Sequence, residues 1–327
     1  MKFVIQPEET GQRLDHFLVK KLNDQTRSQL KKIIEGGLVL INDKPTKVHH
    51  FLKNGDIVSV EIKNPPTPLP PYQSTTLLPY FPTPLPPKII FENNDFLVVD
   101  KPVGLLVHPT EKGEKDTLVD WVAKRYPEIK KIGDENYRGG IIHRLDRDVS
   151  GVMMIAKTNE AYRHLKDQFK SRLVKKEYVA LVYGKIEDFQ GEINLPIGRN
   201  QEGQFVAHPR QGTRIVKARD KTAKTKYEVT EYVKDYTLLK VNILTGRTHQ
   251  IRAHFFAIGH PILGDKIYKP RKKFFHFLRR KIKVIDPGRI FLHSAKIGFN
   301  DLTNQWQEFS SPLPKQLTEF LNACRKK

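Results

Sequence analysis

A proline-rich segment sets the strongest limit on how this sequence can fold. Residues 65–87 hold 10 of the 22 prolines in the 327-residue chain. Proline has a fixed φ and no amide hydrogen, so such a segment forms neither a helix nor an inner strand. We therefore expect an extended spacer at 64–87, a folded unit before it at 11–63 and a second folded unit after it at 88–327.

The net charge of the chain points to a polyanionic partner. Lys and Arg number 57 against 36 Asp and Glu, which gives a net charge of +21. The positive charge is spread along the sequence, and many basic residues alternate with aromatic ones. This pattern favours nucleic acid over an acidic membrane surface, and over a basic protein without any such partner.

Cysteine content and the N-terminal residues bear on the compartment. Cys324 is the single cysteine, so an internal disulfide and a cysteine-type zinc site are both excluded. Residues 1–7 lack the apolar region of a secretory signal, and no apolar run reaches the length of a membrane span. We therefore expect a cytoplasmic protein.

The first unit shows two helical patterns followed by short strands. Apolar residues in 11–22 recur at helical spacing. A second helix is predicted from Thr26, which has capping-box spacing to Gln29, as far as the glycines at 36–37. Strands are predicted at 38–41 and 57–62, separated by a turn at 42–45. The basic residues that share a face of the second helix are Arg27, Lys31 and Lys32.

The second unit mixes strands and helices without a regular βαβ repeat, which favours an α+β fold. Alternating or short apolar runs predict strands at 96–99, 152–156, 176–184, 225–233 and 237–243. Helical spacing predicts helices at 117–125, 159–172 and 248–259. The predicted N-caps of the last two are Asn159 and Thr248, and the inner face of the last is formed by Ile251, Phe255 and Ile258.

A cluster of charged residues precedes the apolar strand at 152–156. Charged groups beside a core strand need either partners or a function. The cluster consists of His143, Arg144, Asp146, Arg147 and Asp148.

Several common site types lack their characteristic residues. The sequence has no P-loop, no Gly-x-Gly-x-x-Gly fingerprint after a strand and no Gly-x-Ser-x-Gly elbow. The spacing of His249, His254 and His260 does not place two imidazoles on one helical face, and no carboxylate pattern completes a metal site. Polar or RNA-facing roles are favoured for these histidines.

Asp146 is the remaining candidate for a catalytic residue. A carboxylate can attack an anomeric carbon or stabilise an oxocarbenium-like centre. Arg144 and Arg147 are close enough in sequence to keep it ionised. Asp148 could supply the second carboxylate that glycosidases use, or serve as an ion-pair partner within the loop. The residues alone favour a plainer alternative, in which Asp146 forms a salt bridge that orients a loop.

Two sets of motifs resemble known families. Residues 11–62 resemble an S4 RNA-binding domain through Arg13-Leu14-Asp15, Thr26-Arg27-Ser28, Val39-Leu40-Ile41-Asn42 and Gly55-Asp56. The stretch from His143 to Asp148, followed by Ser150-Gly151 and Ala156-Lys157-Thr158, resembles the signature of the RluA-type pseudouridine synthases. Further matches to that family, in the same order, are Lys101-Pro102-x-Gly104, His108-Pro109, Lys176-Glu177-Tyr178, Thr245 to Arg252 and His260 to Asp265.

The resemblance implies a fold, a reaction and a role for individual residues. The synthase domain would be α+β, with a mixed, mainly antiparallel sheet flanked by helices. It would detach uracil from ribose C1′, rotate it and rejoin it through C5, without a metal or an organic cofactor. Asp146 would be the catalytic carboxylate and Arg247 its ion-pair partner. Arg144 would hold or replace the flipped nucleotide, Tyr178 would stack on the uracil, and Arg27, Lys31 and Lys32 would contact folded RNA.

The expected partner is RNA. Members of the family with an S4 domain mostly modify large-subunit ribosomal RNA, so we expect this substrate, a monomeric enzyme and no membrane, with tRNA as the alternative substrate. A non-catalytic RNA-binding or ribosome-assembly factor and a nucleic-acid N-glycosidase are the alternative functions.

Two segments depart from the family pattern. One is the proline-rich spacer, and the other is a basic, Phe-rich segment at 269–283. In the second, basic side chains would hold phosphates while aromatic rings stack on bases. The residues assigned to this contact are Lys272, Lys273, Arg279 and Arg280.

Overall fold

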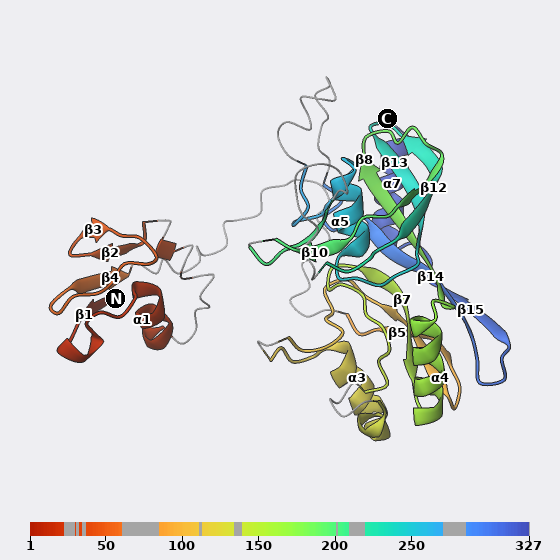
Figure 1. Ribbon diagram of the computed structural model, residues 1–327, viewed down its shortest axis with the longest axis horizontal. Coiled ribbons are helices and arrows are strands. Elements are labelled where there is room, and N and C mark those ends of the chain that lie inside the picture. Colours follow the sequence, from red (N-terminus) through yellow and green to blue (C-terminus); the bar gives the residue numbers. More distant parts are fainter. Residues whose placement is uncertain are drawn as a thin grey trace, which may run out of the picture. The chain divides into compact units, whose positions relative to one another are not determined.

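The computed structural model describes residues 1–22, 30, 33–34, 37–60, 85–110, 113–133, 139–200, 202–208, 220–270 and 286–326. Contacts along the chain divide it into two compact units, Met1–Pro79 and Tyr80–Lys327 (Figure 1). The spacer predicted at 64–87 falls largely on residues 61–84, which lie outside the described ranges. Its bounds, and those of the two domains, therefore stay a prediction.

The first unit is a small antiparallel sheet with helices packed on it. The sheet has the order β1-β4-β2-β3. Its described elements are β1 (Lys2–Val4), the 3-10 helix η1 (Pro7–Glu9), α1 (Leu14–Lys21), β2 (Val39–Ile41), β3 (Lys44–Pro45) and β4 (Ile57–Val60). The predicted first helix is confirmed over 14–21, and the predicted strands are confirmed over 39–41 and 57–60, while residues 61–62 lie outside the described ranges. β1 was not foreseen from the sequence.

Apolar residues at helical spacing build the core of this unit. Leu14, Phe17 and Leu18 of α1 are buried against the sheet. Leu30 and Ile34, from the predicted second helix, belong to the same core. Most of that helix lies outside the described residues, including all three of its basic residues, Arg27, Lys31 and Lys32.

The second unit is built on a nine-stranded mixed sheet. The strand order is β5-β6-β7-β14-β8-β13-β12-β9, and β15 pairs with the far end of β14. All of these neighbours are antiparallel except β7 and β14, which are parallel. The predicted α+β class is therefore confirmed. The strands are β5 (Lys88–Glu92), β6 (Phe96–Lys101), β7 (Ser150–Ala156), β8 (Lys175–Tyr183), β9 (Gln190–Ile193), β12 (Thr225–Val233), β13 (Tyr236–Ile243), β14 (Leu292–Asn300) and β15 (Trp306–Ser310).

Helices cover the sheet, and a separate hairpin stands apart from it. The helices are α3 (Leu118–Arg125), the 3-10 helix η2 (Pro127–Lys131), α4 (Asn159–Lys170), α5 (Gln250–Ala257) and α7 (Lys315–Arg325). The hairpin consists of β10 (Ile197–Arg199) and β11 (Phe205–Ala207). In Figure 1, α3 and α4 lie at the β5–β7 end of the unit and α5 lies at its other end.

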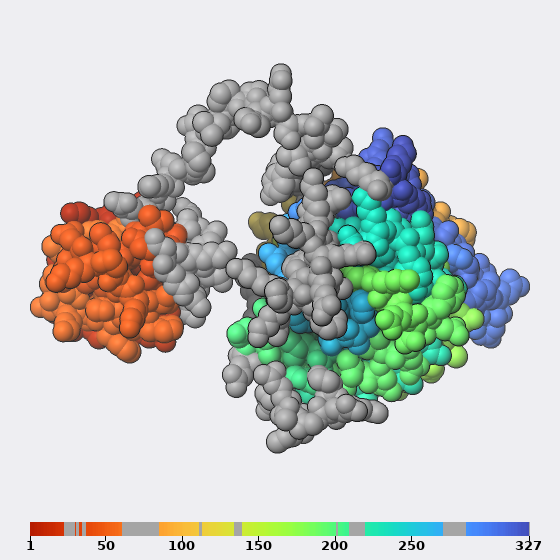
Figure 2. All heavy atoms as spheres, turned by 90° about the horizontal axis from the view of Figure 1, so that it is seen from above, coloured from red at the N-terminus to blue at the C-terminus, as the bar shows by residue number. Residues whose placement is uncertain are grey.

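Strand β8 separates two hydrophobic cores because successive side chains point to opposite faces of a sheet. Tyr178, Ala180 and Val182 face the main core, whereas Leu181 and Tyr183 face a smaller core under α7. In Figure 2 the dark blue atoms of α7 lie next to the turquoise atoms of β12 and β13, against which α7 packs. The face that carries Tyr178 also bounds the cavity described below.

The parallel seam between β7 and β14 requires a glycine. Gly151 pairs with Ser294 and has φ of +123°. A Cβ atom at this position would lie 2.2 Å from the Ser294 carbonyl oxygen. Only glycine combines this φ with so close an approach of two backbones, so the residue fixes how near the two strands can come.

Two helix starts were predicted one residue out of place. Thr158, not Asn159, caps α4, because the Thr158 hydroxyl oxygen accepts from the Ala161 amide. The last predicted helix begins at Gln250, and its N-cap is His249 rather than Thr248. His249 has a left-handed φ of 55°, so the turn before the helix is tighter than the sequence suggested. Ile258 was predicted to face inward, but it follows the helix and is 37% exposed.

Within the described part of the chain, no helix combines the length and the apolar character needed to cross a membrane.

Candidate active site

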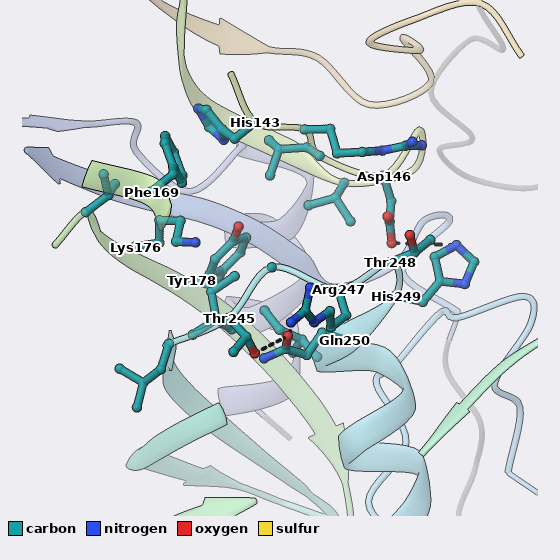
Figure 3. Close-up of a pocket in the computed structure, with 18 of the residues that line it drawn as sticks. His143, Asp146, Phe169, Lys176, Tyr178, Thr245, Arg247, Thr248, His249 and Gln250 are labelled. Carbon is teal, nitrogen blue, oxygen red and sulfur yellow. Dashed lines mark hydrogen bonds and ion pairs between the residues drawn. The ribbon is translucent and has the colours of Figure 1, made fainter. Parts of the chain in front are cut away.

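A cavity of about 460 Å³ opens in the second unit, and the predicted catalytic motif lines it (Figure 3). Its walls come from four parts of the chain: residues 142–149, residues 169–178 from the end of α4 into β8, residues 243–252 leading into α5, and Leu292 of β14. Four of the residues predicted for the site line this cavity, namely Arg144, Asp146, Tyr178 and Arg247.

Asp146 lies on the loop that precedes β7. Leu145 and Val149 on the same loop are buried, which anchors the loop against the core. The Asp146 carbonyl accepts from the Val149 amide in a tight turn. With its neighbours held in this way, the Asp146 side chain faces the cavity and is 17% exposed.

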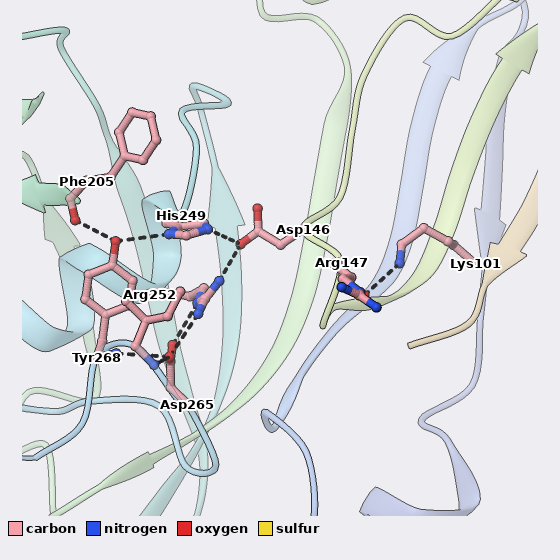
Figure 4. Close-up of polar contacts among 9 residues, drawn as sticks. Lys101, Asp146, Arg147, Phe205, His249, Arg252, Asp265 and Tyr268 are labelled. Carbon is pink, nitrogen blue, oxygen red and sulfur yellow. Dashed lines mark hydrogen bonds and ion pairs between the residues drawn. The ribbon is translucent and has the colours of Figure 1, made fainter. Parts of the chain in front are cut away.

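A buried lysine ties this loop to the end of β6. The Lys101 ammonium donates to the carbonyl oxygens of Pro102 at 2.9 Å, Leu105 at 2.9 Å and Arg147 at 3.3 Å. The Arg147 guanidinium in turn donates to the Gly104 carbonyl at 3.0 Å. Burial lowers the pKa of Lys101 to about 7. The three carbonyl acceptors stabilise the charged amine at this position (Figure 4).

The ion-pair partner of Asp146 is Arg252, so the pairing predicted for Arg247 is wrong. Arg252 Nη1 donates to Asp146 Oδ2 at 3.1 Å. The Arg247 guanidinium lines the same cavity but donates to the Thr222 carbonyl at 3.1 Å. Both arginines belong to the motif at 245–252. The helical turn that begins at Gln250 directs Arg252 inward, whereas Arg247 precedes that turn.

Arg252 is held by a second, fully buried carboxylate. Its Nε and Nη2 atoms donate to Asp265 Oδ2 at 2.7 Å and Oδ1 at 2.9 Å, a bidentate pair. Burial disfavours the charge of Arg252, but the hydrogen bonds to Asp265 and the charge of Asp146 outweigh this and raise the pKa of Arg252. Burial likewise opposes the charge of Asp265, and Arg252 lowers the pKa of Asp265 below its usual value. Asp265 therefore holds the Arg252 guanidinium as a cation, in the orientation from which it donates to Asp146.

The start of the 245–252 motif is organised around Gln250. The Thr245 hydroxyl donates to Gln250 Oε1 at 2.7 Å, and the Arg247 amide donates to the same oxygen at 3.1 Å. Gln250 Nε2 donates to the Lys224 carbonyl at 3.0 Å. The buried Gln250 amide thus fixes the conformation of the backbone that carries Arg247 and Arg252.

Tyr178 and Lys176 face the cavity from β8. They are two residues apart, so their side chains lie on the same face of the strand. Burial raises the pKa of Tyr178, so its hydroxyl is uncharged. Burial lowers the pKa of Lys176 to about 8, and its ammonium lies 5.1 Å from the centre of the Phe169 ring. The His143 ring stacks on the Phe169 ring, with 5.0 Å between the two ring centres.

His249 approaches the Asp146 carboxylate from the cap of α5. Its Nε2 atom lies 3.8 Å from Asp146 Oδ2. Its Nδ1 atom lies 3.1 Å from the Tyr268 hydroxyl oxygen, and that hydroxyl donates to the Phe205 carbonyl at 2.5 Å. Burial lowers the pKa of His249 more than Asp146 raises it. Figure 4 shows this chain of contacts running from Phe205 to Asp146.

The other predicted site residues have mixed outcomes. Arg144 lines the cavity and is exposed, at the rim. Asp148 is exposed and forms no ion pair with any described residue, so its predicted pairing is wrong. Neither Arg144 nor Arg147 forms an ion pair with Asp146 in the described part of the chain, where Arg252 takes that position. Lys272, Lys273, Arg279 and Arg280 lie outside the described residues.

Four residues at the site were not identified as functional from the sequence. They are His249, Arg252, Asp265 and Tyr268. Helical spacing contained a signal for one of them, because Arg252 lies three residues before Phe255 and so shares its inward face. A charged residue within a buried stripe needs a buried partner, and Asp265 is that partner. Nothing in the sequence indicated the turn that brings Tyr268 to His249.

Comparisons with known proteins identify the family of the chain. The family model for RNA pseudouridylate synthases matches residues 95–257, and the S4 domain model matches residues 12–58. A protein of Chloroflexus aurantiacus described as an uncharacterized RNA pseudouridine synthase is 37% identical, over 96% of this chain and 90% of its own length. The ribosomal large subunit pseudouridine synthase D of Blochmanniella floridana is 32% identical, over 99% of this chain and 98% of its own length.

A solved structure gives the same result for the synthase domain. Human RNA pseudouridylate synthase domain containing 1 is 27% identical, with a TM-score of 0.52, and the match covers 74% of this chain and 95% of that one. The chain is thus an enzyme built on a synthase domain, with an S4 domain before it. It belongs to the RNA pseudouridylate synthase family.

Proposed function

We propose that the chain converts specific uridines of large-subunit ribosomal RNA to pseudouridine, with Asp146 as the catalytic carboxylate. One observation carries the assignment of Asp146. Its Oδ2 is held by Arg252 at 3.1 Å inside the cavity, while Oδ1 has no hydrogen-bond partner among the described residues. The carboxylate is oriented through one oxygen, and the other is available to a substrate.

The reaction needs a carboxylate in its ionised form. The N1–C1′ bond of uridine breaks and a C5–C1′ bond forms, while a proton leaves C5 and another joins N1, so no electrons are gained or lost. Asp146 either attacks C1′ or removes a ribose proton on a glycal route. Both roles require the ionised carboxylate, which is the form that pairs with the Arg252 guanidinium.

The cavity supports a flipped-out nucleotide. A base stacked in RNA does not reach a carboxylate inside a cavity, so the target uridine has to leave its stack. The volume of about 460 Å³ falls within the range usual for small-molecule sites, roughly 300–1,000 Å³. The Tyr178 ring offers a flat surface for the uracil. Arg144, exposed at the rim, is placed to occupy the space that the base leaves behind.

Ribosomal RNA is favoured as the substrate by two features. Relatives that match nearly the whole chain are named ribosomal large subunit pseudouridine synthases. The chain also carries an S4 domain and a net charge of +21, which suit a large folded RNA. Mapping pseudouridines in RNA from cells with and without this protein identifies the target.

The test of the catalytic residue is Asp146→Asn. We expect pseudouridine formation in the mapped RNA to fall by about 10³-fold or more, the scale of losing a nucleophile, while RNA affinity changes little. Release of tritium from [5-³H]uridine RNA measures turnover, and filter binding measures affinity.

The matched control is Asp148→Asn, because Asp148 is exposed and outside the cavity. We expect this variant to keep its activity. Retained turnover in Asp146→Asn would contradict the assignment of Asp146. Release of free uracil by the wild-type enzyme would instead identify an N-glycosidase.

A further inference from the structure

The hydrogen-bond chain behind Asp146 fixes where the protons of His249 lie. The Phe205 carbonyl can only accept, so the Tyr268 hydroxyl donates its single proton there, at 2.5 Å. The Tyr268 oxygen then faces His249 Nδ1 at 3.1 Å with a lone pair. Nδ1 must therefore carry the proton of this contact, an assignment made from the hydrogen-bond network.

This assignment leaves His249 Nε2 as a bare acceptor beside the catalytic carboxylate. A neutral imidazole with its proton on Nδ1 has none on Nε2. The distance of 3.8 Å from Nε2 to Asp146 Oδ2 is too long for a hydrogen bond, as expected for two facing acceptors. Arg252 already supplies the cation that Asp146 needs, so a charged imidazole is not required.

An acceptor in this position needs a donor, and the described residues provide none at Nε2. A substrate that fills the cavity is in a position to supply that donor. Building on the proposed role of Asp146, the carboxylate contacts the ribose at C1′ or at the adjacent carbon. The hydroxyl on that adjacent carbon is the donor closest to C1′ on the nucleotide.

We propose that His249 is a ribose-recognition residue that accepts a hydrogen bond from the 2′-hydroxyl of the target uridine through Nε2. Tyr268 and Phe205 hold the imidazole in the required tautomer, so they are positioning residues. The arrangement gives the site a preference for ribose over deoxyribose at the target nucleotide. The 2′-hydroxyl is the group by which a protein distinguishes RNA from DNA at one position.

The test is a cycle of two changes, one in the protein and one in the RNA. The probe is a synthetic RNA that presents the mapped target uridine with either a 2′-hydroxyl or a 2′-deoxy group. Affinities are measured on the Asp146→Ala protein, which is expected to be inert and whose side chain cannot donate to His249. The two RNAs also differ in their sugar-pucker preference. This difference is the same for every protein variant, so it cancels when the affinity ratios of the variants are compared.

The expected result is a preference that depends on His249. With His249 intact, the 2′-hydroxyl RNA should bind about 2- to 12-fold more tightly, the range of one net hydrogen bond between neutral groups. In His249→Phe the two RNAs should bind within about twofold. His249→Gln, which keeps an acceptor oxygen on a similar reach, should restore part of the preference.

Tyr268→Phe removes only the hydroxyl that fixes the tautomer, so it should reduce the preference while leaving the fold intact. Tyr227→Phe is the matched control, because Tyr227 lines a different cavity from the one that contains His249. An unchanged preference in both His249→Phe and Tyr268→Phe would overturn the proposal. So would an equal loss of affinity for both RNAs in His249→Phe.

Failure of this proposal is distinguishable from failure of the proposed function. If Asp146→Asn is inactive but the ribose preference ignores His249, only the recognition role is wrong. If Asp146→Asn turns over RNA, or if no uridine depends on the protein, the proposed function itself is wrong.

Discussion

Lys176 illustrates how a single residue can trade stability for function. Its amine faces the cavity, burial lowers its pKa to about 8, and no described residue accepts a hydrogen bond from it. A buried cation held only against an aromatic ring is costly for the folded state. Such a donor is suited to an acceptor on bound RNA, so we expect the cost to be recovered when substrate binds.

Replacing Lys176 should therefore raise the stability of the folded protein and lower its activity. Because the pKa of about 8 is below the usual value of 10.5, the unfolded chain binds more protons between these pH values, and stability rises with pH there. Below pH 8 the full cost is present. We expect Lys176→Met to raise the free energy of unfolding at pH 7 by about 1–3 kcal/mol. The gain should disappear above pH 10.5.

Activity should move the other way. We expect kcat/KM of Lys176→Met to fall about 10-fold or more, the scale of a hydrogen bond from a charged donor. Denaturant unfolding at several pH values and turnover on the mapped RNA measure the two effects. Lys175→Met is the control, since Lys175 is exposed and packs on Trp306 instead. A destabilised Lys176→Met with normal activity would show that the amine has a structural role.

Asp146, chosen from the sequence, lines the cavity, but its ion-pair partner was assigned to the wrong arginine. Loop residues such as Arg247 take their direction from backbone turns that depend on distant hydrogen bonds, here those of Gln250. The helical period that places Arg252 inward was readable, and the family motif contained both arginines. The contact between His249 and Tyr268 was not readable, because it depends on how the turn after Asp265 folds.

At the scale of elements, the seam between β7 and β14 is the most demanding contact of the sheet. We expect Gly151→Ala to lower the free energy of unfolding of the synthase unit by about 3 kcal/mol or more. The new Cβ would meet the Ser294 carbonyl at 2.2 Å, and alanine disfavours φ of +123°. Calorimetry or denaturant unfolding measures the loss.

Gly259→Ala separates the two contributions. Gly259 also has a positive φ, of +87°, but a Cβ there would meet nothing within 4 Å. We expect this control to lose only about 1 kcal/mol, the cost of the backbone angle alone. Equal losses in the two variants would mean that the close approach of the two strands contributes nothing.

Most elements with strong periodicity were predicted from the sequence, and the irregular ones were not. β7 is wholly buried and reads as an apolar run, while β12 and β13 alternate. The short strands β9, β10 and β11 each have only three or four residues, too few for a period to emerge. The position of β14 between β7 and β8 could not be read at all, because local sequence does not encode which distant strands pair.

At the scale of the whole molecule, the positive charge is distributed unevenly between the two units. Residues 1–79 hold 11 of the 57 basic and 8 of the 36 acidic residues, so only +3 of the net charge of +21 lies there. The long-range attraction for RNA therefore originates mainly in the synthase unit, although an S4 domain matches residues 12–58.

We expect RNA affinity of the full chain to fall steeply with salt, and residues 80–327 alone to keep more than about half of the slope. Affinity measured between 50 and 200 mM salt gives the slope of log K against log salt concentration. The synthase unit has its own hydrophobic cores, which makes the shortened chain a workable comparison. If residues 80–327 lose most of the slope, the surface of the S4 domain binds the RNA phosphates, and the net charge of the synthase unit does not.

The place of β14 in the sheet has a consequence for biosynthesis. This strand lies between β7 and β8, yet it is made more than 100 residues after both of them. Arg252 likewise emerges 106 residues after the carboxylate that it orients. Until β14 has been translated, the strand that joins β7 to β8 is missing and the sheet is incomplete. An enzyme of this design therefore becomes competent only after β14 has been translated.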